Sequence, residues 1–118
     1  MIEQPAVSPG HLPERYVCVW EFRVAPAREE EFVAAYGPSG DWARLFRQAS
    51  GYIETLLLRD QTVPGRFLTV DRWSSQHAHD MFFARFNRDY EALDGRCASL
   101  TELEVNLGSF REQLDPAR

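Results

Sequence analysis

The chain has 118 residues, of which 44% are hydrophobic and 26% are charged, and this length and composition are typical of one globular domain. Its 13 basic and 18 acidic residues give a net charge of −5, which argues against a surface for nucleic acid or anionic membrane, because both need clustered positive charge. It has no run of about 18 apolar residues, so the sequence predicts no membrane span.

Residues 1–14 contain three prolines, no apolar run and no cluster of basic residues, so they lack the pattern of a signal peptide. We expect a disordered or loosely draped tail over residues 1–14, a single domain over residues 15–112 and a short C-terminal tail over residues 113–118. The two cysteines, Cys18 and Cys97, are too few for a disulfide scaffold. They suit a reducing compartment, and we expect a cytoplasmic protein.

The first strong pattern predicts a β-strand over residues 15–24. Large apolar side chains alternate along it and share one face: Tyr16, Cys18, Trp20 and Phe22. Pro26 and the three glutamates after it then indicate a helix start, because carboxylates in the first turn favour the helix dipole. We expect Gly37, in a left-handed conformation, to end this helix before Pro38.

Asp41 is the expected N-cap of a short second helical piece, which turns three apolar side chains inward: Trp42, Leu45 and Phe46. Two further strands are predicted over residues 52–59 and 66–73. The loop between them, residues 60–65, contains Pro64 and Gly65 at the two corners of a turn. These two strands therefore form an antiparallel hairpin.

A long helix is predicted over residues 75–94, with Ser74 or Ser75 as its cap and Gly95 just past its end. Its inward stripe recurs at spacings of three and four residues: Phe82, Phe86, Tyr90, Leu93 and Cys97. A last strand is expected over residues 100–107. The order β-α-β-β-α-β predicts an α+β, ferredoxin-like fold, a four-stranded antiparallel sheet with two helices on one face.

The strands carry apolar side chains on both faces, although two helices cover only one of them. In the second strand, we expect Tyr52, Leu56 and Leu58 on one face and Ile53 and Leu57 on the other. An uncovered apolar face of this size predicts an interaction site, and a two-fold homodimer with sheets packed face to face would cover it. The alternative is a monomer in which the N-terminal tail covers the open face.

No phosphate-binding glycine loop, nucleophile elbow or C-x-x-C pair is present. His77 and His79 are two residues apart on a helix and therefore on different faces, so we expect no metal site. Trp20 and Trp73 lie on neighbouring strands of the predicted sheet, and His79 and Phe83 of the long helix can approach them. Such an aromatic pocket suits a flat hydrophobic ligand.

Residues 16–107 resemble the antibiotic biosynthesis monooxygenase (ABM) family. The features that carry the resemblance are VWEFRVAPAREEEF at 19–32, SGYIETLLLRD at 50–60 and, most characteristic, FLTVDRWSS at 67–75. The resemblance implies a dimer of ferredoxin-like subunits, described as a dimeric α/β barrel. One branch of the family oxidises anthrones to quinones with molecular oxygen and without metal or flavin, and another branch degrades haem.

The resemblance carries over to particular residues. Trp73 matches a tryptophan shared by both branches, whereas Thr69 stands where the anthrone branch has an asparagine and His79 where it has a tyrosine. In the haem branch, an asparagine falls near Trp20 and the iron-ligating histidine falls at Phe83, which cannot ligate iron. Haem degradation is therefore the weaker interpretation.

The leading hypothesis is a monooxygenase that needs no cofactor and acts on a flat aromatic substrate such as an anthrone or phenol. Its expected catalytic residues are Trp73, which stacks on the substrate, His79, which accepts a proton, and Thr69, which steadies the anion. The expected substrate-binding residues are Trp20, Arg72, Phe83 and Phe86. The alternatives are a dimeric module that binds a hydrophobic metabolite without turnover and a non-oxidative isomerase or cyclase.

Overall fold

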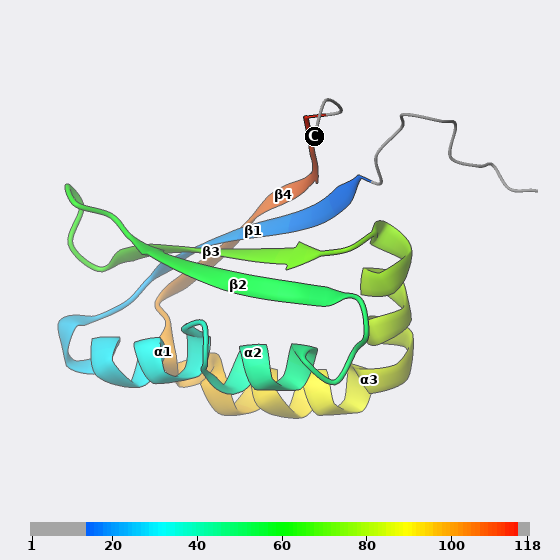
Figure 1. Ribbon diagram of the computed structural model, residues 1–118. Helices are drawn as coiled ribbons and strands as arrows, with labels where there is room; N and C mark the ends of the chain where they lie inside the picture. Colours follow the sequence, from blue (N-terminus) through cyan, green and yellow to red (C-terminus); the bar gives the residue numbers. More distant parts are fainter. Residues whose placement is uncertain (1–13, 116–118) are drawn as a thin grey trace, which may run out of the picture.

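The computed structural model describes residues 14–115 (Figure 1). Apart from Glu14, the expected N-terminal tail lies outside the described residues, as do residues 116–118. In chain order the elements are β1 (Arg15–Arg23), the 3-10 turn η1 (Pro26–Arg28), α1 (Glu29–Tyr36), α2 (Asp41–Phe46), β2 (Tyr52–Arg59), β3 (Arg66–Trp73), α3 (Gln76–Cys97), the 3-10 turn η2 (Ala98–Leu100) and β4 (Leu103–Glu112). The predicted order of elements is confirmed.

The four strands form one antiparallel sheet in the order β2-β3-β1-β4. All three α-helices lie on the same side of this sheet, as Figure 1 shows. This layered α+β arrangement is the predicted ferredoxin-like fold. Since β1 and β3 are the two central strands, their alternating side chains supply the middle of both sheet faces.

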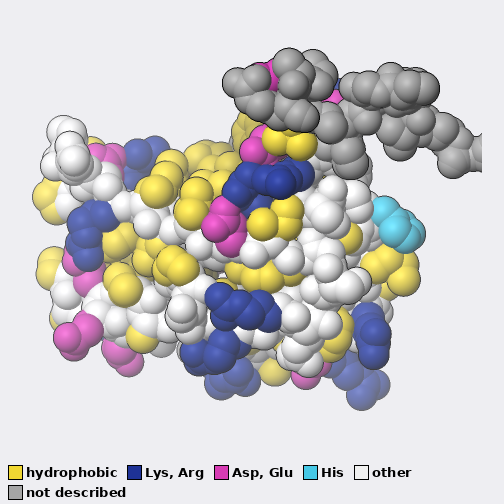
Figure 2. All heavy atoms as spheres, in the orientation of Figure 1, with side chains coloured by type: hydrophobic (Ala, Val, Ile, Leu, Met, Phe, Trp, Pro, Cys, Tyr) yellow, Lys and Arg dark blue, Asp and Glu magenta, His cyan; other side chains and the backbone are white. Residues whose placement is uncertain are grey.

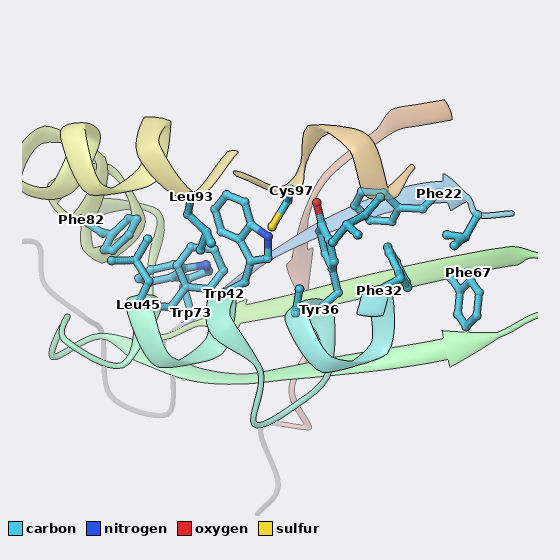
Figure 3. Close-up of a cluster of buried hydrophobic side chains, with 14 residues drawn as sticks. Phe22, Phe32, Tyr36, Trp42, Leu45, Phe67, Trp73, Phe82, Leu93 and Cys97 are labelled. Carbon is cyan, nitrogen blue, oxygen red and sulfur yellow. The ribbon is translucent and has the colours of Figure 1, made fainter. Parts of the chain in front are cut away.

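The core lies between the sheet and the helices (Figure 3). Its largest fully buried side chains come from three elements: Phe32 of α1, Phe67 and Trp73 of β3, and Phe82 of α3. The rings contact one another directly, with the Phe32 and Phe67 ring centroids 4.9 Å apart and those of Trp73 and Phe82 5.4 Å apart. Burial of these aromatic surfaces is the main driving force that holds the helices on the sheet.

A β-bulge changes which side chains of β2 share a face. The register with β3 shifts between Tyr52 and Glu54. Tyr52 therefore faces the core, with its ring centroid 5.4 Å from that of Trp73, while Leu56 and Leu58 are 40% and 46% exposed on the opposite face. The prediction that these three residues share a face is wrong, because the extra residue of the bulge reverses the alternation.

The last strand begins and ends later than predicted. Residues 98–100 form η2, and β4 runs from Leu103 to Glu112. Its register with β1 shifts opposite Val19 and Trp20, next to Gly108, which has φ of +127°. The sequence pattern stops at this bulge because the alternation of side chains breaks there, but the backbone pairing continues beyond it.

The two short helices differ from prediction at their ends. Gly37 has φ of −74° and ψ of 174°, so its predicted left-handed conformation is wrong. Gly37 precedes Pro38, and the ring of a proline drives the residue before it to an extended conformation. The N-cap of α2 is Gly40 rather than Asp41, which is the first helical residue and pairs with Arg44.

The long helix starts as predicted and ends later. Ser75 is its N-cap, with its hydroxyl oxygen accepting a hydrogen bond from the backbone N–H of Ala78 at 3.0 Å. The helix continues through Gly95 to Cys97, because Cys97 is buried against the core. Phe86 has non-helical φ and ψ and marks a kink within the helix. Figure 1 shows that α3 changes direction along its length. Within residues 14–115, no helix combines the length and the apolar character that a membrane crossing requires.

The sheet face opposite the helices, here called the open face, is apolar at its centre. Its apolar side chains come from all four strands: Val17, Val19, Leu56, Leu58, Leu68, Val70, Leu103, Val105 and Phe110. Phe110 is 50% exposed and Leu103 is 47% exposed. Figure 2 shows hydrophobic side chains gathered over the strands, with arginine and acidic side chains among them. Exposed apolar area of this kind marks an interaction surface.

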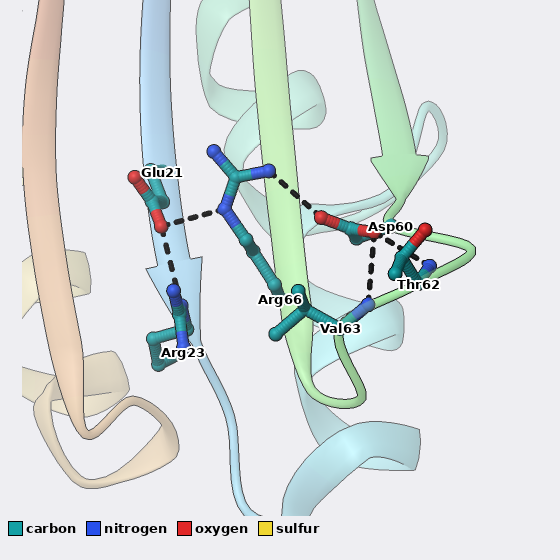
Figure 4. A network of polar contacts seen from close by, with 6 residues as sticks. All are labelled: Glu21, Arg23, Asp60, Thr62, Val63 and Arg66. Atoms are coloured by element: carbon teal, nitrogen blue, oxygen red, sulfur yellow. Dashed lines mark hydrogen bonds and ion pairs between the residues drawn. The ribbon is translucent and has the colours of Figure 1, made fainter.

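Charged groups lie at both ends of the open face. At one end Arg66 binds Glu21 of β1 at 2.7 Å and Asp60 of the hairpin loop at 2.8 Å (Figure 4). Backbone N–H groups of the loop also donate to Asp60, and together with Arg66 they lower the pKa of its carboxyl to about 2. At the other end Arg72 binds Glu112, and also Glu54.

We predict that Gly65→Ala destabilises the protein while Gly95→Ala does not. Gly65 has φ of +78°, and an added Cβ would lie 2.5 Å from the carbonyl oxygen of Val24. The expected loss is about 1–3 kcal/mol in the free energy of unfolding, measured by urea denaturation.

Gly95 is the matched control, because it lies within a helix and an added Cβ meets nothing within 4 Å. Its replacement is expected to stabilise the protein by about 0.5–1 kcal/mol. Equal effects of the two substitutions would contradict the assigned turn.

Candidate functional site

A pocket of about 290 Å³ opens between the sheet and the helices. Its walls are mainly aromatic and are formed by Trp20, Phe22, Tyr36, Trp42, Phe46, Trp73, Phe83 and Tyr90. Its polar lining residues are Cys18, Thr55, Thr69, Asp71, His79, Asp94, Glu104, Asn106 and Ser109. A mostly apolar cavity with a few convergent polar groups is the usual form of a small-molecule site.

The alternation of the two central strands builds the floor of this pocket. Every second residue of β3 faces the helices, which places Thr69 and Asp71 in the lining between two buried aromatic side chains. From β1, the paired residues are Trp20 opposite Thr69 and Cys18 opposite Asp71. The prediction that Trp20 and Trp73 share a sheet face with His79 and Phe83 above them is confirmed by this arrangement.

Five of the seven predicted site residues line the pocket, and they come from three elements: Trp20, Thr69, Trp73, His79 and Phe83. Trp73 is only 1% exposed. Its ring is enclosed by Phe46, Tyr52, Phe82 and His79, with centroids 5.4–5.5 Å away. Trp73 is therefore a part of the pocket wall, and Trp20, which also lines the pocket, is partly exposed.

His79 lies on the first turn of α3 among aromatic rings. Its ring centroid is 4.9 Å from that of Tyr16, 5.5 Å from that of Trp73 and 4.7 Å from that of Phe83. Its Nδ1 lies 3.0 Å from the Asp80 carboxylate, which is 60% exposed and belongs to the surface of the helix. Only Nε2 is therefore free of this contact.

Arg72 and Phe86 do not line the pocket. Arg72 lies on the open face, where Glu54 and Glu112 bind it, because neighbouring residues of a strand point to opposite faces. Phe86 stacks on Phe82, with ring centroids 5.2 Å apart, at the bend of α3. The structure therefore removes both residues from the candidate site.

Asp71 is the functional candidate that the sequence analysis missed. The Thr55 hydroxyl donates to its Oδ1 at 2.6 Å, and the Tyr52 hydroxyl lies 2.7 Å from the same Thr55 oxygen. Because a hydroxyl has a single proton, Tyr52 donates to Thr55 when Thr55 donates to Asp71. Burial raises the pKa of the Asp71 carboxyl to about 6, although the hydrogen bond from Thr55 acts in the opposite direction.

Other lining residues also come from outside the predicted set. Asn106 and Ser109 of β4 reach the pocket on either side of the β4 bulge, and Tyr90 reaches it from the second half of α3. Burial raises the pKa of Tyr90 to about 12 and, with the nearby Asp71 carboxylate, that of Cys18 to about 11. Both groups are therefore protonated near neutral pH and available as hydrogen-bond donors.

One signal in the sequence identifies Asp71. It is an acidic residue at an inward position of a strand whose other inward residues are apolar or uncharged. A carboxyl group at such a position has an unusual environment, which is typical of functional sites. Within residues 14–115, no three His, Cys, Asp or Glu side chains gather as ligands for a metal ion.

The chain matches a known protein family. The model of the antibiotic biosynthesis monooxygenase family matches residues 15–85, which include β1, β2, β3 and the first part of α3. That segment contains the five lining residues predicted from the sequence as well as Asp71. No curated protein sequence matches the chain.

Solved structures with the same fold come from several organisms. An asparagine-to-alanine variant of SnoaB, a cofactor-independent oxygenase from Streptomyces nogalater, has 22% identity and a TM-score of 0.62, with coverage of 86% of this chain and 95% of that chain. A protein from Shewanella oneidensis has 20% identity, a TM-score of 0.62 and coverage of 86% and 93%. A conserved protein from Methanosarcina mazei has 14% identity, a TM-score of 0.60 and coverage of 86% and 95%. At these identities the likeness shows the fold alone.

We predict that Asp71→Asn stabilises the protein near neutral pH but not in acid. As pH rises from the ordinary carboxyl pKa of 3.8 to about 6, the unfolded chain loses this proton while the folded protein keeps it, so the free energy of unfolding falls. The neutral amide avoids that loss. At about pH 7.5 the variant is expected to gain about 1–3 kcal/mol in urea denaturation, whereas near pH 4 it should match the wild type.

The matched control is Asp89→Asn, the same chemical change at an exposed position of α3. It is expected to alter stability equally at the two pH values. A gain from Asp71→Asn that does not depend on pH would contradict a desolvated carboxyl group at this position.

Proposed function

Because this chain belongs to the antibiotic biosynthesis monooxygenase family, we propose that it is a cofactor-independent monooxygenase that oxidises a flat aromatic substrate with molecular oxygen. The observation that carries the proposal is the pocket itself. Its aromatic walls fit a planar ring system, and its floor carries groups that can take up a proton and hold a developing anion. Anthrone-like and phenolic molecules have this shape and acidity.

The chemistry needs little from the protein beyond proton transfer. In an anthrone, loss of a methylene proton gives an electron-rich anion that can itself reduce oxygen. Overall, the methylene group and one O2 become a carbonyl group and one water, so the substrate is oxidised and oxygen is reduced without an external electron donor. The tasks for the protein are to remove the proton, stabilise the anion and exclude bulk water.

The lining residues divide these tasks. Trp20 and Phe83 offer aromatic surface to the ligand, while Trp73 forms the wall behind it. Thr69 stands at a floor position where its hydroxyl can donate one hydrogen bond to an oxygen of the substrate. His79 lines the helical side of the pocket, where its imidazole can exchange a hydrogen bond with the substrate.

One observation favours a second function, a dimeric module that binds a hydrophobic metabolite without turnover. The same aromatic pocket would serve such a module, and Thr69 and His79 stand where the resemblance places an asparagine and a tyrosine. A non-oxidative isomerase or cyclase would remove a proton from its substrate in the same pocket without using oxygen. Measurements of oxygen uptake and ligand affinity separate these functions.

We predict oxygen uptake by metal-stripped protein with anthrone, above the spontaneous rate in buffer. The double variant Trp73→Phe, His79→Ala is expected to lose about 100-fold or more of the protein-dependent rate, since it alters the aromatic wall and removes a hydrogen-bonding group, so that the substrate is no longer held in its reactive position. An oxygen electrode gives the rates, and anaerobic fluorescence titration gives the affinity for anthrone.

The outcomes differ between the two functions. Uptake that is lost in the variant supports the oxygenase. Absence of uptake together with tight binding that Trp73→Ala weakens would replace it with the binding module.

A homodimer completes the proposal. The apolar centre of the open face is bounded at both ends by ion-pair clusters around Arg66 and Arg72. Two such faces packed together would bury the exposed Leu56 and Leu58 side chains, and charged groups at the ends would fix the register. The family resemblance implies the same assembly.

We predict that the protein sediments as a dimer at micromolar concentration and that Leu58→Glu weakens the dimer. A carboxylate among the apolar side chains of the open face is expected to cost about 2 kcal/mol or more, which is about 30-fold in the dissociation constant. Met81→Glu is the control, because Met81 is 55% exposed on α3, away from the open face. A stable monomer of the wild type at this concentration would contradict the assembly.

A further inference from the structure

We propose that Asp71 is the general base of this pocket and that its substrates are neutral carbon or oxygen acids, which bind uncharged and give their proton to the Asp71 carboxylate. The inference deepens the proposed function and rests on it for the kind of substrate. It concerns a residue that neither the sequence analysis nor the family match assigns. Four observations carry it.

The first observation is the place of the carboxyl group. Asp71 is carried by a central strand, on the floor of the cavity, between two positions whose side chains are almost completely buried, Thr69 and Trp73. Strands hold a side chain more rigidly than loops, which suits a group that must meet one atom of a ligand.

The second observation is the hydrogen bonding. The Tyr52–Thr55–Asp71 chain orients the carboxylate through Oδ1. Within residues 14–115, no protein donor reaches Oδ2, so that oxygen is available to a ligand proton. The Thr55 hydroxyl group orients the carboxylate through Oδ1, and Oδ2 is free to accept a proton from the ligand. This is the geometry that proton abstraction requires.

The third observation is the charge around Asp71. The titratable groups that line the same cavity are Cys18 from β1, Tyr36 from α1, His79, Tyr90 and Asp94 from α3, and Glu104 from β4, with Tyr52 of β2 behind Thr55. No arginine is among the described lining residues. An anionic ligand would therefore meet carboxylates without a compensating cation, and the pocket favours an uncharged one.

The fourth point is the conservation of charge in the proton transfer from the substrate to Asp71. The carboxylate and the neutral acid become a carboxylic acid and the substrate anion, so one proton moves and the net charge of the pocket does not change. The electrostatic cost of forming an anion beside Asp94 and Glu104 is thereby offset by neutralising Asp71. The elevated pKa of this carboxyl, about 6, also leaves it ionised yet basic near neutral pH.

The test separates proton removal from oxidation. Anthrone is incubated with the full chain in D2O without oxygen, and exchange of its methylene hydrogens is followed by NMR. The wild type is expected to accelerate exchange above buffer, and Asp71→Asn to lose about 100-fold or more of that acceleration. Asparagine still accepts the Thr55 hydrogen bond, so the anaerobic affinity for anthrone is expected to stay close to that of the wild type.

Two further variants distinguish a base from a structural residue. Asp89→Asn, the exposed control, is expected to keep the wild-type exchange rate. Thr55→Val removes the hydrogen bond that favours the ionised carboxylate, so the rising limb of the exchange rate should move to higher pH. A residue with only a structural role would not produce that shift.

Each outcome decides the inference. Exchange that depends on Asp71 supports it even if no oxygen is consumed, and that combination would reject only the oxygenase function. Exchange that survives Asp71→Asn, exchange that is abolished by His79→Ala alone, or absence of exchange in the wild type would overturn it.

Discussion

The strict alternation of side chains along the two central strands is the constraint on which the rest of the structure depends. β1 and β3 have hydrogen-bonded neighbours on both sides, so their side chains can point only to one face of the sheet or to the other. One face receives the helices and forms the core and the pocket, while the other presents an apolar centre with charged ends. A shift of one residue would exchange these two surfaces completely.

The same alternation explains how a hydrophobic core contains a polar floor. Phe67 and Trp73 anchor the two ends of β3 in the core, each 1% exposed, and thereby fix the orientation of the two residues between them. Thr69 and Asp71 are held inward by this packing. Desolvation of the Asp71 carboxyl destabilises the folded protein, and the burial of the aromatic side chains around it offsets this free-energy cost. A buried carboxyl group of this kind is typical of a functional site.

The bulges adapt this regular pattern to the pocket. In β2 the bulge brings Tyr52 to the same side as Thr55, which makes their hydrogen-bonded chain to Asp71 possible. In β4 the bulge at Gly108 lets Asn106 and Ser109 both line the cavity. Irregular pairing therefore occurs where polar groups are supplied to the site.

The sequence by itself determined the elements and their order, because periodicity and turn chemistry are local properties. The bounds of β2 and β3 were predicted correctly, and so was the turn at Gly65. Trp20, Trp73, His79 and Phe83 were also predicted to share a pocket, since alternation in β1 and β3 and the phase of α3 place them on facing surfaces, and the family resemblance added Thr69.

Only the tertiary structure decided what depends on several elements at once. Alternation along the sequence could not show the bulges, and so the predicted face of Tyr52 in the sheet was wrong. The exclusion of Phe86, which lies at the bend of α3, was seen only in the structure, whereas alternation along β3 by itself places Arg72 and Trp73 on opposite faces. The basicity of Asp71 arises from desolvation by strands and helices that are distant in the chain, so the sequence indicates only that the carboxyl group faces inward.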